Sequence, residues 1–196
     1  MNWIQHPVTL EGTKVKLSPL ESAHFNELVE VAKQKAIWAN YSIDGSEPGK
    51  MASLLKSAVL MRATGEQYPF TIIDKINNKI IGSTRLYNAY PEHRKLEIGW
   101  TWYDPAYWGS GHNIECKYLL LGYCFEILKA VRVQFQTNET NERSRAAIQK
   151  IGATYEGILR KERKMENGIF RNTVMFSITD DEWPGVKKML EERLAH

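Results

Sequence analysis

Two glycines, Gly109 and Gly111, stand where a strand-like segment meets a helix-like one, within WTWYDPAYWGSGHNIECKYLLLGYCFEIL (residues 100–128). A helix N-terminus presents backbone N–H groups without partners and a partial positive charge. Glycines just before it let the backbone approach an anion closely, so this corner predicts a phosphate cradle. A tight turn that needs positive φ explains the same glycines equally well. A P-loop is excluded because no Gly-Lys-Ser/Thr follows, and the third glycine of the dinucleotide fingerprint is missing.

The two cysteines, Cys116 and Cys124, could supply a nucleophilic or redox-active thiol. On one helix they would lie ~12 Å apart along the axis, too far for a disulfide. No Cys/His spacing resembles a zinc site, and no acid–base partner stands near Cys116 in the sequence. We therefore interpret both as buried structural thiols of a protein from a reducing cytosol.

The composition is that of a globular enzyme or binding protein. The chain has 196 residues, 43% of them hydrophobic and 25% charged, which predicts a single domain over residues 1–196. The net charge of +3 is too small to favour a nucleic-acid binder. No apolar run reaches membrane-spanning length, and the first residues lack a secretory signal pattern. A cytoplasmic protein without nucleic-acid or membrane partners is expected.

The elements that must position the glycine corner follow from hydrophobic periodicity and turn residues. Strands are predicted at 13–20, 68–74, 79–89, 94–104, 131–138, 154–166 and 169–178, with helices at 21–35, 51–63, 114–128, 141–151 and near the end of the chain. In the strand before the glycines, Leu96, Ile98, Trp100 and Trp102 alternate with Glu97, Gly99, Thr101 and Tyr103 and are expected on the opposite face. This order predicts an α/β (α+β) fold with a mostly antiparallel sheet and one crossover.

The residues Trp108 to Asn113, WGSGHN, resemble the Gln/Arg-x-x-Gly-x-Gly/Ala motif of the GNAT acetyltransferase superfamily. The neighbouring segments agree with this resemblance. LEIGWTW precedes the motif, an amphipathic helix and a strand follow, and NERSRAAIQKIGATYEG comes next. The whole is similar to the RimJ/RimL-like branch from residue 14 to about residue 178. Trp108 stands where the family usually has Gln or Arg, and Asn113 where it usually has Gly or Ala.

The resemblance implies acetyl-CoA as acyl donor, bound in a splay between the two central strands of a GNAT-like sheet, with no metal. The pyrophosphate would lie on backbone amides after Trp108, and the pantetheine arm would pair with the strand that ends at Tyr103. The cofactor-binding residues it implies are Thr101, Trp102, Tyr103, Trp108, Gly109, Ser110, Gly111, His112, Asn113, Ile114, Asn138 and Asn141. For His112, backbone contact or packing is favoured over a role as a base.

Amine acetylation needs a base for the amine and a proton for the leaving thiolate. Glu97 is the candidate base, although a solvent-facing glutamate on a half-buried strand is the simpler reading. Ser144 follows Asn141 by one helical turn and matches the position where RimL-like enzymes carry a serine that protonates the thiolate. An exposed helix serine is the simpler reading there. Tyr118 and Tyr155 are less favoured alternatives.

The sequence thus predicts an acetyltransferase that moves an acetyl group to a primary amine by direct attack in a ternary complex. The alternative is a non-catalytic CoA- or anion-binding module of the same fold. The acceptor stays open among protein N-termini, including those of ribosomal proteins, and peptide amines, polyamines and amino-sugar antibiotics. The aromatic residues Trp38, Tyr41, Tyr68 and Tyr87 could line a pocket for it, and core packing explains them equally well. For the basic run 160–164 with Arg171, a solvated hairpin face is favoured over recruitment of an acidic acceptor or binding of the 3′-phosphate of CoA. A homodimer through the long C-terminal strands is a further expectation.

Overall fold

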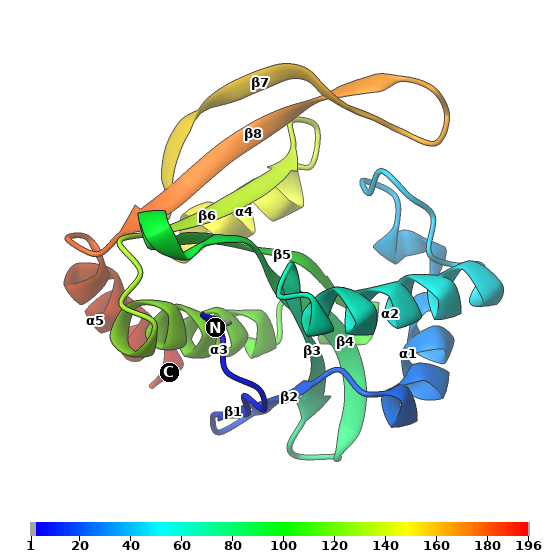
Figure 1. Cartoon of the computed structure of the whole chain (residues 1–196), viewed down its shortest axis with the longest axis horizontal. Helices are drawn as coiled ribbons and strands as arrows, with labels where there is room; N and C mark the ends of the chain where they lie inside the picture. The colour runs from blue at the N-terminus through cyan, green and yellow to red at the C-terminus, as the bar shows by residue number, and fades with distance from the viewer. Residues whose placement is uncertain (1–2, 196) are drawn as a thin grey trace.

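A computed structural model describes residues 3–195 of the chain. Within these residues, eight strands form one sheet in the order β1-β2-β3-β4-β5-β6-β8-β7 (Figure 1). The strands are β1 (Leu10–Glu11), β2 (Val15–Pro19), β3 (Gln67–Asp74), β4 (Lys79–Tyr90), β5 (Lys95–Tyr103), β6 (Arg132–Asn138), β7 (Thr154–Lys164) and β8 (Phe170–Thr179). Among these strands β5 and β6 pair in parallel, and each other neighbouring pair is antiparallel. The mostly antiparallel α/β sheet and its one crossover are confirmed.

In the described part of the chain, five α-helices flank the sheet (Figure 1). They are α1 (Phe25–Ala32), α2 (Pro48–Ala63), α3 (His112–Gly122), α4 (Glu142–Lys150) and α5 (Trp183–Leu194), and a π-helix, Tyr123–Ile127, continues α3. One hydrophobic cluster joins α3 and α5 to the sheet, and a second joins α1 and α2 to it. The sheet therefore separates two layers of helices, so a gap in it would connect them.

The sheet has such a gap between β5 and β6. Their register runs only from Lys95 opposite Arg132 to Glu97 opposite Gln134. Beyond Glu97 both strands continue without pairing to each other, so their facing edges keep backbone groups free for a ligand. This divergence is the splay that the family resemblance implies.

The prediction of which β5 side chains share a face of the sheet is wrong beyond Gly99. Arg85 of β4 lies opposite Gly99 and Ser83 lies opposite Trp102, so β5 holds an extra residue there. Trp100 takes a positive φ of 51° at this bulge. A bulge reverses the alternation of side chains. Consequently Trp102 packs with α1 and α2, whereas Tyr103 joins the cluster of Leu96 and Ile98.

Both cysteines are free and fully buried, Cys116 on α3 and Cys124 on the π-helix that continues it. Burial raises the pKa of both thiols, so they stay protonated and apolar in character. Neither Cys116 nor Cys124 lines the pocket that Gly109 and Gly111 border. The interpretation as structural thiols agrees with this placement. Across residues 3–195, no helix combines the length and apolarity that a membrane span requires.

Candidate active site

A pocket occupies the splay between β5 and β6 and opens toward both helix layers. Its floor is formed by the diverging strands, from Ile98 to Tyr103 on β5 and from Phe135 to Thr137 on β6. One end reaches the glycine corner and α4, and the other reaches the α1–α2 loop and the tip of the β7–β8 hairpin. The pocket therefore joins the predicted phosphate cradle to the opposite face of the sheet.

The glycine corner has the backbone that a phosphate cradle needs. Gly109 and Gly111 have φ values of +78° and +88°, and Gly111 is the N-cap residue just before α3. Within residues 3–195, the amides of Gly109, Gly111, His112 and Asn113 have no hydrogen-bond acceptor. Free amides at a helix N-terminus are suited to an anion. The positive φ, more than crowding, explains the glycines, because a Cβ on Gly109 would meet nothing within 4 Å.

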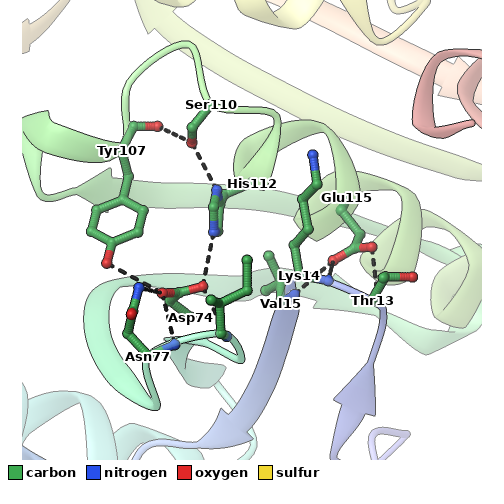
Figure 2. A network of polar contacts seen from close by, with 10 residues as sticks. Thr13, Lys14, Val15, Asp74, Asn77, Tyr107, Ser110, His112 and Glu115 are labelled. Atoms are coloured by element: carbon green, nitrogen blue, oxygen red, sulfur yellow. Dashed lines mark hydrogen bonds and ion pairs between the residues drawn. The ribbon is translucent and has the colours of Figure 1, made fainter. Parts of the chain in front are cut away.

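Side chains beneath the corner hold its shape (Figure 2). His112 Nε2 lies 3.2 Å from Asp74 Oδ1, and its Nδ1 lies 2.7 Å from Ser110 Oγ. Ser110 in turn donates to the backbone oxygen of Tyr107 at 2.6 Å, and the Tyr107 hydroxyl donates to Asp74 at 3.3 Å. The Ser110 and His112 side chains thus turn away from the pocket toward β3. They act on the cradle by fixing its backbone.

A buried carboxylate, Glu115, fixes the start of α3 to the N-terminal strands (Figure 2). It accepts hydrogen bonds from the amides of Thr13, Lys14 and Val15 at 2.9, 2.8 and 2.6 Å. Gly12 leaves room for this contact, since a Cβ there would come within 2.6 Å of the carboxylate carbon. The Lys14 ammonium lies 3.4 Å from where a Gly111 Cβ would be, so a positive charge stands beside the corner.

Most of the predicted cofactor-binding residues meet in the pocket. Those that line it are Thr101, Trp102, Tyr103, Trp108, Gly109, Gly111, Asn113, Ile114 and Asn141. Ser110, His112 and Asn138 do not line it. The buried Asn138 side chain instead accepts from the Thr140 amide at 3.3 Å and shapes the turn before α4. The side chains of these three residues do not face the pocket, and they affect it only by fixing the backbone around it.

Trp108, the first residue that departs from the family motif, has a definite contact. The Arg143 guanidinium of α4 stacks on its ring at 3.5 Å from the ring centroid. This cation–π contact links α4 to the glycine corner across the mouth of the pocket. Nothing in the structure explains why asparagine stands at position 113.

Comparison with known sequences agrees with this geometry. The sequence profile of the acetyltransferase (GNAT) domain matches residues 14–154. The chain belongs to the GNAT acetyltransferase family. The family resemblance of the WGSGHN segment is thereby confirmed, despite Trp108 and Asn113.

The relatives of this GNAT protein agree with the RimJ/RimL-like branch. "Putative ribosomal N-acetyltransferase YdaF" of Bacillus subtilis (strain 168) is 32% identical over 57% of this chain and 60% of that protein. The matches to three such B. subtilis proteins span 60% to 66% of their lengths. A crystal structure described as a "putative acetyltransferase" from T. thermophilus is 34% identical, covers 97% of this chain and 99% of that one, and has a TM-score of 0.86. Mycobacterium smegmatis RimJ in complex with CoA-disulfide shares the fold at 19% identity and a TM-score of 0.82, with 96% of this chain and 95% of that one covered.

Glu97 of this GNAT site is completely buried, so the solvent-facing reading of this residue is wrong. The Tyr87 hydroxyl donates to its Oε1, and Asn88 and Gln136 donate to its Oε2 at 3.2 and 2.9 Å. Burial raises the pKa of the Glu97 carboxyl, and these hydrogen bonds oppose the shift. A carboxylate with a raised pKa is a stronger base than an exposed one.

Glu97 does not itself line the pocket, but Tyr87 and Gln136 do. The Tyr87 hydroxyl therefore lies between the pocket and Glu97, a feature that the sequence did not reveal. Gly99 makes room for this arrangement, because a Cβ there would lie 2.9 Å from the Tyr87 hydroxyl oxygen. The one available signal in the sequence was the position of Tyr87 in the strand pattern just before the strand that carries Glu97.

Ser144 lines the pocket beside Asn141, as the one-turn spacing predicts. Asn141 caps α4 with its side chain, which accepts from the Ser144 amide at 3.0 Å. The Ser144 hydroxyl has no hydrogen-bond partner within residues 3–195. The alternatives lie elsewhere: the Tyr118 hydroxyl donates to Glu191 of α5 at 2.9 Å, and Tyr155 packs edge-on against Phe176. Neither tyrosine lines the pocket.

The residues predicted for an acceptor divide into two groups. Tyr41 and Tyr87 line the far end of the pocket, together with Arg163 of the basic run and Arg171. Trp38 instead packs on Trp102 in the core. Tyr68 is likewise a core residue. The Tyr41 hydroxyl donates to the Thr101 backbone oxygen at 2.6 Å, so this part of the bulge already has a partner.

Lys117 is a site residue that sequence reasoning missed. It is only 6% exposed, yet it lines the pocket and donates to Thr101 Oγ1 at 2.6 Å. Burial lowers the pKa of its ammonium to about 8. The signal in the sequence was a lone lysine among the apolar positions of α3.

We expect Lys117→Met to stabilise the protein at pH 7, with a gain that shrinks as pH rises. Because the pKa of Lys117 is lowered from 10.5 to about 8 on folding, the unfolded chain binds more protons between these values, and wild-type stability rises there. The difference in unfolding free energy should fall by about 3 kcal/mol across that range. Chemical unfolding at several pH values measures it, with Lys56→Met as a charge-matched exposed control. A difference that is constant with pH would contradict the burial argument.

Proposed function

We propose that this GNAT protein transfers an acetyl group from acetyl-CoA to a primary amine by direct attack in a ternary complex. Bound acetyl-CoA would supply the acyl group and leave as the CoA thiol. The observation that carries the proposal is the continuous pocket from the free amides of the glycine corner, through the splay, to Tyr87 in front of Glu97. Donor and acceptor could meet there without a covalent acyl-enzyme, and no cysteine lines the pocket.

Each side chain then has a defined task. Free amides and the helix dipole at the start of α3 hold the pyrophosphate, and the unpaired edge of β5 receives the pantetheine arm. Tyr87 accepts a proton from the amine as its own hydroxyl proton passes to Glu97, which lets the nitrogen attack. Ser144 donates its hydroxyl proton to the departing thiolate and takes a proton back from water, so the serine ends the cycle neutral. Among the described residues, those that line the pocket include lysines and arginines but no Asp or Glu. This positive lining suits a cofactor with several phosphates.

The test of this function is thermal unfolding with acetyl-CoA, followed by thiol release with a panel of primary amines. At a ligand concentration of a hundred times the dissociation constant, binding should add about 2.7 kcal/mol to the unfolding free energy. Absence of any stabilisation by acetyl-CoA or CoA would reject the proposal. Stabilisation without thiol release from any amine would favour the non-catalytic CoA-binding module.

Ser144→Ala should reduce kcat by about 10- to 100-fold while leaving acetyl-CoA affinity almost unchanged, since the hydroxyl acts only on the leaving thiolate. The deficit should shrink with an acetyl thioester whose thiol has a lower pKa, because that thiolate needs no proton to leave. Steady-state kinetics with the two donors measures both effects. An equal kcat in variant and wild type would exclude Ser144 as the acid.

A protein N-terminus, including that of a ribosomal protein, is a proposed acceptor because "Putative ribosomal N-acetyltransferase YdaF" is a relative. The homodimer and the cytoplasmic location also stay proposals. The strand β7 forms the edge of the sheet and carries the exposed side chains of Ile158 and Leu159, which is where a second copy would pair.

A further inference from the structure

The far end of the pocket carries two arginines whose one ion pair in the described residues is with Glu162, the neighbour of Arg163 along the chain. Arg163 of β7 and Arg171 of β8 lie directly opposite each other in the hairpin, and both line the pocket. Arg171 forms no ion pair within the described chain, and its buried Nε has no hydrogen-bond partner. The one ion pair of Arg163 is with the adjacent Glu162, at 3.3 Å.

This arrangement is unfavourable in the protein alone. Like charges at directly opposite positions of an antiparallel pair repel each other. Burial lowers the pKa of the Arg171 guanidinium and the charge of Arg163 lowers it further, while the charge of Glu162 offsets only part of this shift. A buried donor without an acceptor adds to the penalty. A bound anion would remove each of these unfavourable effects.

The arginines belong to the acceptor end of the pocket. Arg171 and the hydrophobic Val174 and Phe176 differ in parity along β8, so Arg171 faces the other side of the sheet, as Glu97 does. The charge of Arg163 lowers the pKa of the Glu97 carboxyl, and both arginines act in the same direction on Tyr87. The free amides of the cradle lie at the other end of β5, beyond Tyr103. The arginines are therefore next to the proposed base.

The hairpin tip that carries these arginines is tied down. The Glu166 amide donates to the Ser42 oxygen at 3.2 Å, and the Glu166 carboxylate accepts from the Asp44 amide at 3.0 Å and pairs with Lys50. In Figure 1 the β7–β8 hairpin accordingly arches over the sheet toward the loop before α2. The arginines are thus held in place before any ligand arrives, which favours specific recognition.

This end of the pocket also contains a hydrogen-bond acceptor without a donor. Gln136 lines the pocket, and its buried Oε1 has no hydrogen-bond donor within the described residues. Its Nε2 is engaged with Glu97. A primary amine bound beside Tyr87 could donate a hydrogen bond to this free Oε1. This end of the pocket therefore offers a hydrogen-bond acceptor for an amine, on Gln136, and two arginines for an anion.

We propose that the amine acceptor carries a carboxylate or similar anionic group a few bonds from its amino group, and that Arg171 and Arg163 bind this anion. The inference rests on the proposed acetyltransferase function and makes its substrate class specific. The anion has two sources, the α-carboxylate of a free amino acid or an acidic side chain next to a peptide N-terminus. Both present the same chemistry to the arginines.

The test compares matched acceptors that differ only in charge. One arm uses C-terminally amidated peptides that start Ser-Asp or Ser-Asn, and the other uses free amino acids and their α-amides. We expect kcat/KM to favour the anionic member of at least one pair by about 10- to 100-fold, mainly through KM. The arm that shows the preference identifies the source of the anion. Equal rates within both pairs would overturn the proposal.

Variants separate a binding role from a structural one. Arg171→Gln should remove most of the preference for the anionic member of each pair, and Arg171→Lys should restore part of it. Arg160→Gln is the matched control, because Arg160 is an exposed arginine of β7 that does not line the pocket. Equal preferences in Arg171→Gln and Arg160→Gln would overturn the assignment to Arg171.

A binding measurement covers the case in which no acceptor reacts. With CoA present, the acetylated Ser-Asp peptide and N-acetylated free acids should raise the unfolding temperature more than their neutral counterparts do. Arg171→Gln should abolish this difference. Equal shifts for charged and neutral products would overturn the proposal. Stabilisation by acetyl-CoA without thiol release would count against the proposed catalysis and leave this binding comparison decisive for the anion site.

Discussion

Replacing Glu97 by Gln is expected to lower kcat by about 100- to 10,000-fold, the range typical of losing a general base. Glutamine keeps the size of the side chain but cannot take up the proton that Tyr87 would pass on. Asn88 and Gln136 can still donate to the amide oxygen, so the fold should persist. Rates of thiol release with saturating acetyl-CoA measure the effect, and an unchanged acetyl-CoA thermal shift serves as the folding control.

The pH profile of the same variant gives a second readout. Because burial raises the pKa of Glu97, the wild-type rate should increase with pH along a limb that lies above the ordinary glutamate value of 4.5. That limb should be missing in Glu97→Gln. Tyr87→Phe should lose activity to a comparable extent if the proton passes through the Tyr87 hydroxyl. Turnover of Glu97→Gln within a few-fold of wild type would show that another group or water is the base.

Gly111→Val is expected to abolish the stabilisation by acetyl-CoA. The native φ of +88° at Gly111 is strained for any β-branched residue, and the new side chain would stand where a phosphate approaches the free amides. At a concentration that adds about 2.7 kcal/mol to the wild type, the variant should gain almost nothing. Calorimetric titration should show a dissociation constant at least about 10-fold higher, since each 1.4 kcal/mol is one factor of ten.

Gly168→Val is the matched control for this variant. Gly168 has a φ of +83° in the β7–β8 hairpin, and a Cβ there would meet nothing within 4 Å. Both substitutions therefore introduce similar backbone strain, but only one of them lies at the start of α3. Gly168→Val should lose stability and keep the acetyl-CoA shift. If Gly111→Val kept its affinity, the cradle at this corner would be refuted.

Local features of the chain were predictable from the sequence. The positive φ of Gly109 and Gly111 and the helix start after them depend on residues adjacent in the chain. The order of strands and helices follows from periodicity, and it placed the crossover between β5 and β6 correctly. The one-turn spacing of Asn141 and Ser144 put both on the pocket side of α4. Such features need no knowledge of distant contacts.

The facing of side chains beyond Gly99 was not predictable in this way. The bulge at Trp100 arises from the register between β4 and β5, which is a property of two strands together. It moved Trp102 and Tyr103 to the faces opposite those expected from simple alternation. In the same way, Ser110 and His112 turn toward Asp74, a residue 38 positions away from His112 in the chain.

The sequence by itself therefore determined the family, the order of the elements along the chain and the glycine corner, because these depend on local conformation and motif order. Only the tertiary structure decided how the site is completed. Glu97 is buried behind Tyr87, Lys117 faces the splay, and Arg163 and Arg171 line the same pocket as Tyr87. Each of these placements depends on strand register and on packing between segments far apart in the chain, and no pattern within one segment carries that information.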